Sequence, residues 1–201
     1  DEDNPNTTDA TDDGDKPTIN IAATDATAIE GAAGDVLVYE VSQTNPSNFD
    51  TVAHVSLSGA VSAADVASIS YTDANGVVQT VTDPAAIQAL FTNGFDVKIP
   101  AGDTTAPAIT ITPVDDERYE KSEDLVLSIS TSSDVTAGTM SASGTITDED
   151  NPNTTDATDD GDKPTINIAA TDATAIEGAA GDVLVYEVSQ TNPSNFDTTV
   201  H

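Results

Sequence analysis

The sequence predicts an all-β protein built as a two-sheet sandwich, and three observations lead to this prediction. Short segments alternate apolar and polar residues with a period of two, as half-buried strands do. Turn-forming residues separate these segments at short intervals. Aromatic residues make up only 4% of the chain, whereas Val, Ile, Thr, Ser and Ala are abundant. That composition suits thin β-layers better than a large mixed core.

The strands are predicted, in chain order, over residues 19–28, 36–41, 52–57, 67–72, 77–82, 95–99, 108–112, 125–130 and 139–146. Asn75-Gly76 predicts a tight hairpin turn, since both residues tolerate a positive φ. One short helix is predicted over 83–91, with Asp83 as its N-cap and Pro84 at the first helical position. Asn93-Gly94 then ends the helix. This order predicts an immunoglobulin-like Greek-key β-sandwich with an inserted hairpin and one short helix.

The chain contains an internal repeat. Residues 1–51 recur without substitution as residues 148–198, at an offset of 147. The predicted organisation is an acidic linker (1–16, the end of a preceding repeat), a complete sandwich (17–150), a second acidic linker (151–163) and the start of the next repeat (164–201). We interpret His201 as a point of excision from a longer array. Residues 164–201 hold only the first two strands of a sandwich, so they are expected to be disordered or to pair with strands of another molecule.

Charge and composition exclude several classes of function. The 201 residues carry 36 Asp and Glu against 5 Lys and Arg, for a net charge of -31. Binding to nucleic acid or to an anionic membrane surface needs clustered basic residues, so neither partner is expected. The absence of cysteine excludes disulfides and thiolate metal sites. No apolar run has the length of a membrane span, and direct membrane insertion is therefore not expected.

No catalytic constellation is present in the sequence. The two histidines, His54 and His201, do not belong to a triad-like pattern. A sugar cleft for paired carboxylates is normally floored by aromatic side chains, which are scarce here, and no glycine-rich phosphate loop is found. The protein is therefore not expected to be an enzyme.

Acidic loops are predicted to meet at one end of the sandwich. Successive strands run up and down, so every second loop falls at the same end. Those loops are the ones at Glu30 and Asp65, the segment 115–124, and the exit at 148–150. Two carboxylates about 5 Å apart repel by roughly 3 kcal/mol at an effective dielectric of 20. A hard divalent cation would relieve this, and oxygen ligands in irregular loops favour Ca²⁺. The alternative is a solvated acidic surface.

Four motifs in order resemble a known family. They are Ala28-Ile29-Glu30-Gly31, the segment Ile99-Pro100-Ala101-Gly102-Asp103-Thr104-Thr105, the run from Ile111 to Glu123, and Gly144-Thr145-Ile146-Thr147-Asp148-Glu149-Asp150. Together they resemble a Calx-β domain. More narrowly, they resemble the immunoglobulin-like extender repeats of giant bacterial surface adhesins exported by type I secretion, the biofilm and ice-binding RTX adhesins. The resemblance covers 17–150 and, in truncated form, 164–201.

The resemblance implies a calcium-rigidified, monomeric spacer that projects a distal ligand-binding region from a secreted, outer-membrane-tethered adhesin. Its partners would be the neighbouring repeats of the same chain. The Ca²⁺ ligands that it implies are Glu30, Asp115, Asp116, the carbonyl of Arg118, Glu120, Glu123, Asp148, Glu149 and Asp150. A further family Asp has no clear match. The alternation of loops favours Asp65 for it, with Asp73 as the rival.

Two departures from the family leave questions open. The insertion 67–94 is longer than a minimal Calx-β domain contains. It suggests an alternative function, a module that binds carbohydrate or protein through this hairpin and helix. Glu149 replaces the middle Asp of the usual triplet, which leaves the number of ions open.

The acidic linker offers a second possible ion site. Its opening approaches an EF-hand loop, but Thr158 and Asn167 stand where acidic ligands belong, so we reject an EF-hand. A looser site remains, in which acids from both sides of the linker hold one ion and stiffen it. Its candidate ligands are Asp148, Asp150, Asp156, Asp159, Asp160 and Asp162.

Overall fold

The computed structural model describes residues 16–116, 118–131, 135–148 and 162–201, which form two compact units. The described part of the first unit runs to Asp115 and resumes over Ser122–Thr147. The second unit consists of the loop Asp116–Lys121 and the described residues from Asp148 onward. The loop lies in sequence within the predicted repeat 17–150, but it groups with the residues that follow that repeat.

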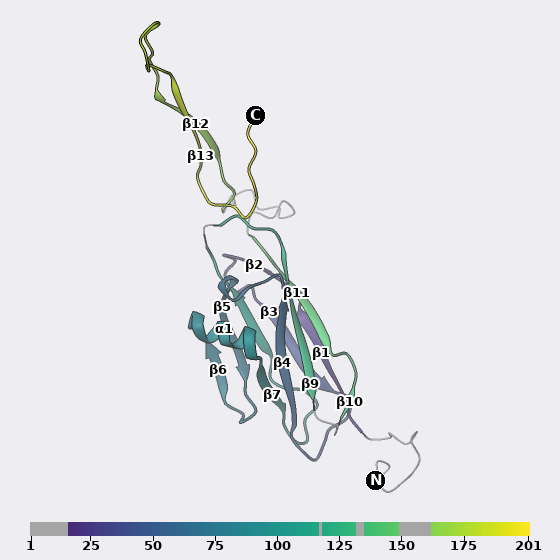
Figure 1. The fold of residues 1–201 in the computed structure, drawn as a ribbon. Helices are drawn as coiled ribbons and strands as arrows, with labels where there is room; N and C mark the ends of the chain where they lie inside the picture. The colour runs from purple at the N-terminus through teal and green to yellow at the C-terminus, as the bar shows by residue number, and fades with distance from the viewer. Residues whose placement is uncertain (1–15, 117, 132–134, 149–161) are drawn as a thin grey trace. The chain divides into compact units, whose positions relative to one another are not determined.

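The first unit is a sandwich of two sheets, which confirms the predicted all-β class (Figure 1). One sheet has six strands in the order β10-β1-β3-β8-β5-β6, and the other has five in the order β2-β11-β9-β4-β7. The strands of the first sheet are β1 (Thr18–Asp25), β3 (Leu37–Gln43), β5 (Val66–Thr72), β6 (Val78–Val81), β8 (Ile109–Pro113) and β10 (Thr136–Ala137). Those of the second are β2 (Thr27–Ile29), β4 (Thr51–Gly59), β7 (Phe95–Ile99), β9 (Glu123–Thr131) and β11 (Ser141–Thr147).

The first predicted strand, 19–28, is divided between the two sheets. β1 pairs antiparallel with β3, and its register shifts between Ala23 and Asp25. The chain then crosses to the other sheet, where β2 pairs parallel with β11. A single alternating segment thus supplies one strand to each layer, and the irregularity near Asp25 allows the crossing. Sequence alternation alone does not distinguish this from one continuous strand.

Alternating apolar residues from both sheets fill the core. Ile21, Leu37 and Leu127 are each at most 1% exposed. One polar side chain spans the layers, because the Tyr39 hydroxyl of β3 donates to the Leu125 carbonyl of β9 at 2.9 Å. Gly144 of β11 makes room for it, since a Cβ there would stand 2.6 Å from the Tyr39 hydroxyl oxygen. A buried polar group with a partner fixes the relative position of the sheets.

The insertion forms the hairpin β5–β6 and the helix α1 (Pro84–Asn93), as predicted. The Ala86 amide donates to the Asp83 carboxylate at 2.9 Å, which confirms the N-cap, and Gly94 ends the helix with φ +70°. Ile87 packs into the core, and the rings of Tyr71 and Phe95 lie 4.1 Å apart. In the part of the chain that the structure describes, no helix is long and apolar enough to cross a membrane.

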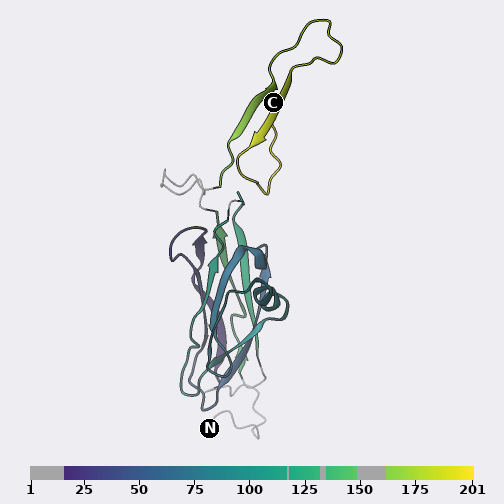
Figure 2. The ribbon, with the colours of Figure 1, turned by 90° about the vertical axis from the view of Figure 1, so that its left-hand side faces the viewer.

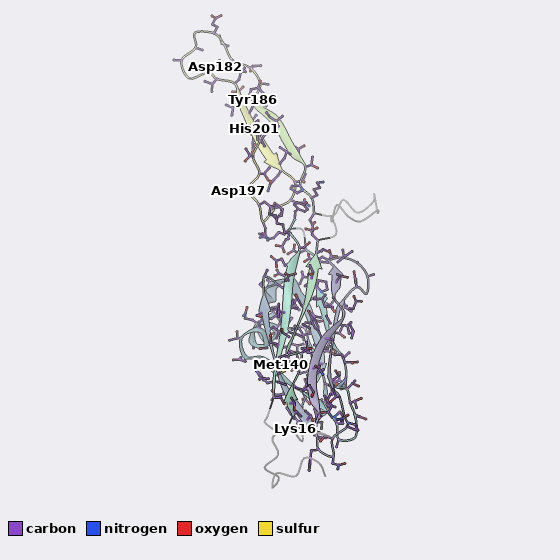
Figure 3. All side chains as sticks on the ribbon, turned by 90° about the vertical axis from the view of Figure 1, so that its right-hand side faces the viewer. Lys16, Met140, Asp182, Tyr186, Asp197 and His201 are labelled. Atoms are coloured by element: carbon purple, nitrogen blue, oxygen red, sulfur yellow. The ribbon has the colours of Figure 1, made fainter. Side chains whose placement is uncertain are left out.

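The second unit contains a two-stranded antiparallel sheet, formed by β12 (Ile166–Asp172) and β13 (Val185–Gln190) (Figure 2). Its register matches the first copy, since Ile166 pairs with Gln190 as Ile19 pairs with Gln43. Every side chain of both strands is exposed, including Tyr186 (Figure 3). Because their apolar side chains stay uncovered, the prediction that this segment is disordered or pairs with another molecule stays a prediction. The two strands pair with each other, because the hairpin register is set within the repeated sequence itself.

Candidate metal centre at one end of the sandwich

The topology of the first unit brings several predicted ligands to one end. Ile29 is paired with Thr147, Gly59 with Leu125, and Val66 with Pro113. The segments that begin or end at these pairs therefore share one end of the sandwich. They carry Glu30, Asp65, Asp115 and Glu123. The predicted alternation of loops is confirmed for these four residues.

Glu30 and Asp115 flank the tight turn that follows β2. Glu30 is only 5% exposed, and its amide donates to the Thr147 carbonyl at 2.9 Å. Gly31 has φ +68°, a conformation that suits glycine, and a Cβ there would stand 3.2 Å from Asp115 Oδ1. Asp35 stabilises the turn by accepting a hydrogen bond from the Ile29 amide at 3.0 Å.

An open hollow of about 240 Å³ lies beside this turn. Its lining residues are Ile29, Gly31, Ala32, Ala33, Gly34, Asp35, Thr112, Pro113 and Asp115. The backbone of the turn and two carboxylates face the same space. Oxygen donors of this kind suit Ca²⁺ better than zinc or copper.

Asp65 and its rival Asp73 lie at opposite ends of β5. Asp65 precedes the strand and belongs to a capping box, in which its Oδ2 accepts from the Ser62 amide at 2.6 Å. Asp73 follows the strand in the hairpin turn and accepts from the amides of Asn75 and Val77, both at 2.9 Å. These hydrogen bonds, the one from Val77 above all, lower the pKa of Asp73. The choice of Asp65 over Asp73 therefore agrees with their locations, whereas a ligand role for Asp65 stays a prediction.

Another group of predicted ligands lies in the second unit. The Glu120 amide donates to Asp148 Oδ2 at 2.6 Å, and Asp148 is 5% exposed. The Arg118 amide donates to Asp116 Oδ1 at 2.7 Å. The Arg118 guanidinium also lies 3.9 Å from Glu120 Oε1. The sequence assigned only the carbonyl of Arg118 to the site, so its side chain was missed as a partner of an acid.

Asp162 is 6% exposed and lies against Asn192. The Asn192 side-chain amide donates to the Asp162 carbonyl at 3.1 Å and lies 3.5 Å from Asp162 Oδ1. Asn192 was not among the sequence-based candidates. An Asn in a run of turn formers carries no metal signal of its own, and only the fold pairs it with Asp162.

The described residues do not by themselves complete a metal cage. Within residues 16–116, 118–131, 135–148 and 162–201, no three acidic or histidine side chains come close enough to hold an ion. Glu149, Asp150, Asp156, Asp159 and Asp160 lie outside the described residues. The implied ligand set is also divided between the two units. What the described part supplies is an acidic, oxygen-only surface, with a buried carboxylate at Glu30 in the first unit and at Asp148 and Asp162 in the second.

No protein-family model and no curated protein sequence matches this chain. Among solved structures, the chain is similar to an apo-form Calx CBD1 domain, with 15% identity and a TM-score of 0.45 over 67% of this chain and 99% of that one. It is also similar to CBD12 from CALX1.2, with 15% identity and a TM-score of 0.43 over 65% of this chain and 44% of that one. The chain is similar, too, to the calcium binding domain CBD12 of CALX1.1, with 15% identity and a TM-score of 0.42 over 65% of this chain and 45% of that one.

Proposed function

We propose that this chain is a calcium-stabilised structural spacer, an extender repeat of a large bacterial cell-surface adhesin. In this role Ca²⁺ neutralises the acidic end of each sandwich, and the string of repeats projects a distal ligand-binding region from the cell. The chain acts as a tether and performs no chemistry.

One observation carries the spacer role. The sandwich begins at Thr18, where β1 pairs with the last residues of β3, and ends at Thr147, where β11 pairs with the end of β2. Since β2 continues the direction of β1, the chain enters at one end of the sandwich and leaves at the other. Identical units joined in this way extend a string with each copy. Residues 1–51 recur exactly at an offset of 147 residues, so a second unit of the same sequence begins directly after the first.

The calcium role is supported by the charge. A net charge of -31 opposes compaction unless cations neutralise part of it. In the first unit, Glu30, Asp65, Asp115 and Glu123 share the end from which the acidic linker departs. Calcium is abundant outside cells and scarce inside them. A chain that folds only with calcium would therefore fold after export.

The alternative binding role of the insertion receives no comparable support. Ligand-binding surfaces usually present exposed aromatic side chains, whereas Phe95 is 6% exposed and Phe91 packs against the core. The exposed apolar residues of the hairpin are Val77 and Val78.

Distance measurements between spin labels test the spacer role. The chain has no cysteine, so Ala89→Cys on α1 and Ala180→Cys between β12 and β13 provide two unique and exposed attachment points. We expect the distribution of label-to-label distances to narrow when calcium is added to the chelated protein. Equally broad distributions in calcium and in chelator would contradict a calcium-stiffened spacer.

A further inference from the structure

The internal repeat places the same loop in two different surroundings. Phe49 and Phe196 occupy equivalent positions in identical stretches of sequence. Phe49 is 79% exposed. Phe196, by contrast, is half-buried. The surroundings of the two loops can therefore be compared residue by residue.

Phe196 contacts the acidic loop Asp116–Lys121, which precedes β9 in the sequence. The Tyr119 and Phe196 rings meet edge to face, with centroids 5.4 Å apart and planes at 87°. Lys121 Nζ lies 4.7 Å from the centre of the Phe196 ring. Edge-to-face rings and a cation over an aromatic face are both favourable arrangements. The aromatic side chain is thus held by two different side chains of one loop.

Backbone hydrogen bonds join the same two segments. The Tyr119 amide donates to the Pro193 carbonyl, and the Asn195 amide donates to the Tyr119 carbonyl, each at 3.1 Å. Tyr119 and Ser194 form a parallel β-bridge. The contact therefore fixes the register of one loop against the other.

The Asn195 side chain completes this contact. Its Oδ1 accepts from Arg118 Nη1 at 2.7 Å, and its Nδ2 donates to Glu120 Oε1. A guanidinium only donates and a carboxylate only accepts, so an amide can satisfy both at once. Neither Asp nor Leu at this position could do so. The contact between the two loops therefore combines a specific polar pairing at Asn195 with the packing of the Tyr119 and Phe196 rings.

In the complete repeat, the equivalent loop is already shaped for the same contact. The Phe49 amide donates to Ser47 Oγ at 3.0 Å, and the Phe196 amide donates to Ser194 Oγ at 3.1 Å. Asp50 anchors the loop by accepting from the Ala101 amide at 2.9 Å and from Lys98 Nζ at 3.0 Å. The Ala101 amide and Lys98 lower the pKa of Asp50, because both stabilise its charged form.

This loop joins β3 to β4, at the end of the sandwich opposite to Glu30 and Asp115. Each repeat therefore carries the aromatic loop at one end and the loop that contains Tyr119 at the other. Two complementary surfaces at opposite ends of one unit would allow a head-to-tail contact that repeats without closing.

We propose that Asn48 and Phe49 are the docking residues for a preceding copy of this repeat. They receive that copy's equivalents of Arg118, Tyr119, Glu120 and Lys121. Successive repeats are thereby locked by a direct side-chain contact, in addition to any ion that they share. The partner is a second copy of the same unit, because the described residues that contact Asn195 and Phe196 belong to the loop of the copy that precedes them.

Hydrogen exchange on the 201-residue chain in millimolar calcium tests the contact itself. We expect the Tyr119 and Asn195 amides to be protected, and ring protons of Tyr119 to show nuclear Overhauser effects to Phe196. Phe196→Ala should lower this protection by about threefold to tenfold, the equivalent of one lost aromatic pair. Phe49→Ala is the matched control, since it removes the same side chain from the same sequence, and it should leave both amides unchanged. Fast exchange in the unsubstituted chain, or equal effects of the two substitutions, would overturn the proposal.

A longer chain tests the docking role of Phe49. With one more copy of residues 1–147 placed before residue 1, Phe49 gains a preceding partner. The Phe49 ring should then show contacts to the added copy's equivalent of Tyr119, and Phe49→Ala should expose that residue's amide. A Phe49 ring that stays solvent-exposed in the longer chain would refute the docking role. The docking contact and the calcium dependence of stability are measured separately. A protected contact in a chain whose stability does not depend on calcium would contradict only the calcium-stabilised spacer proposed above.

Discussion

The carboxylate of Asp115 lies directly over Gly31, such that a Cβ on that glycine would stand 3.2 Å from Asp115 Oδ1. The contact joins the turn after β2 to the end of β8, two segments more than 80 residues apart in sequence. It fixes one predicted calcium ligand beside the backbone that carries another, Glu30. Glycine at position 31 is therefore favoured by the position of an acid as well as by its own φ of +68°.

Gly31→Ala should weaken calcium binding by moving Asp115. The substitution adds a methyl group to the space beside the carboxylate and also strains the positive φ, at a cost of about 1 kcal/mol or more. Calorimetric titration with Ca²⁺ measures the affinity, and denaturant unfolding measures the stability.

Gly34→Ala is the control for this substitution. Its φ is +82°, and a Cβ there would meet nothing within 4 Å. It should lose about the same stability from backbone strain while it keeps its calcium affinity. Equal calcium affinities for the two variants would show that the position of Asp115 does not matter for the ion.

Because the Tyr39 hydroxyl is buried, we expect the protein to lose stability in alkali. Burial raises the pKa of Tyr39 to about 12 from 10.0, with the nearby charge of Asp124 adding to this and a hydrogen bond near Gly144 opposing it. Between these two values the folded state holds a proton that the unfolded state has lost. The stabilisation is therefore complete below pH 10 and is lost as the pH rises towards 12, by about 2–3 kcal/mol. Urea unfolding at several pH values measures this slope.

Tyr39→Phe should reduce the alkaline slope, and it should cost about 1 kcal/mol at neutral pH through the lost hydrogen bond to Leu125. Part of the slope should persist, because burial also raises the pKa of Tyr71. Tyr186→Phe removes the equivalent side chain of the second copy, which is 59% exposed, and serves as the control. An unchanged slope in Tyr39→Phe would contradict this assignment.

At Asp73 we expect a smaller loss of stability in acid, confined to the hairpin β5–β6. The hydrogen bonds that it accepts lower its pKa below the value of 3.8 for an isolated side chain. Its contribution is therefore complete above pH 3.8 and is lost as the pH falls through the lower value of the folded state. Carboxyl NMR titration measures the pKa directly, and a value at or above 3.8 would contradict the observed turn. Asp73→Asn should remove the effect and speed amide exchange at Val77.

Much of the fold could be predicted from local patterns. The alternating segments gave most of the strands, and Asp83, Pro84 and Gly94 marked the helix, because caps and turns depend on residues close in sequence. The alternation of loops placed Glu30, Asp65 and Asp115 at one end without any contact information. The crossing between β1 and β2 and the short strand β10 were missed, since both depend on pairing with distant strands.

The contacts of the candidate sites were harder to predict. Asn192, Asn195 and Phe196 lie among turn formers, and nothing local marks them as partners of acids or aromatic residues. The repeat does contain one usable signal, an isolated Phe in the polar stretch Asn-Pro-Ser-Asn-Phe-Asp. An apolar side chain in a polar stretch can mark a contact with a partner, although single exposed apolar side chains are also normal on protein surfaces. The identity of that partner required the fold.

Thermal unfolding of the whole chain in millimolar CaCl₂ and in excess chelator tests the central claim most directly. Calcium bound only to the folded state adds about 2.7 kcal/mol per site when its concentration is a hundredfold above Kd. One such site should raise the Tm by roughly 5–10 °C in a domain of this size. Magnesium at the same concentration should give a smaller shift. Superimposable melting curves in calcium and chelator would contradict the account, and would leave the acidic end as a solvated surface.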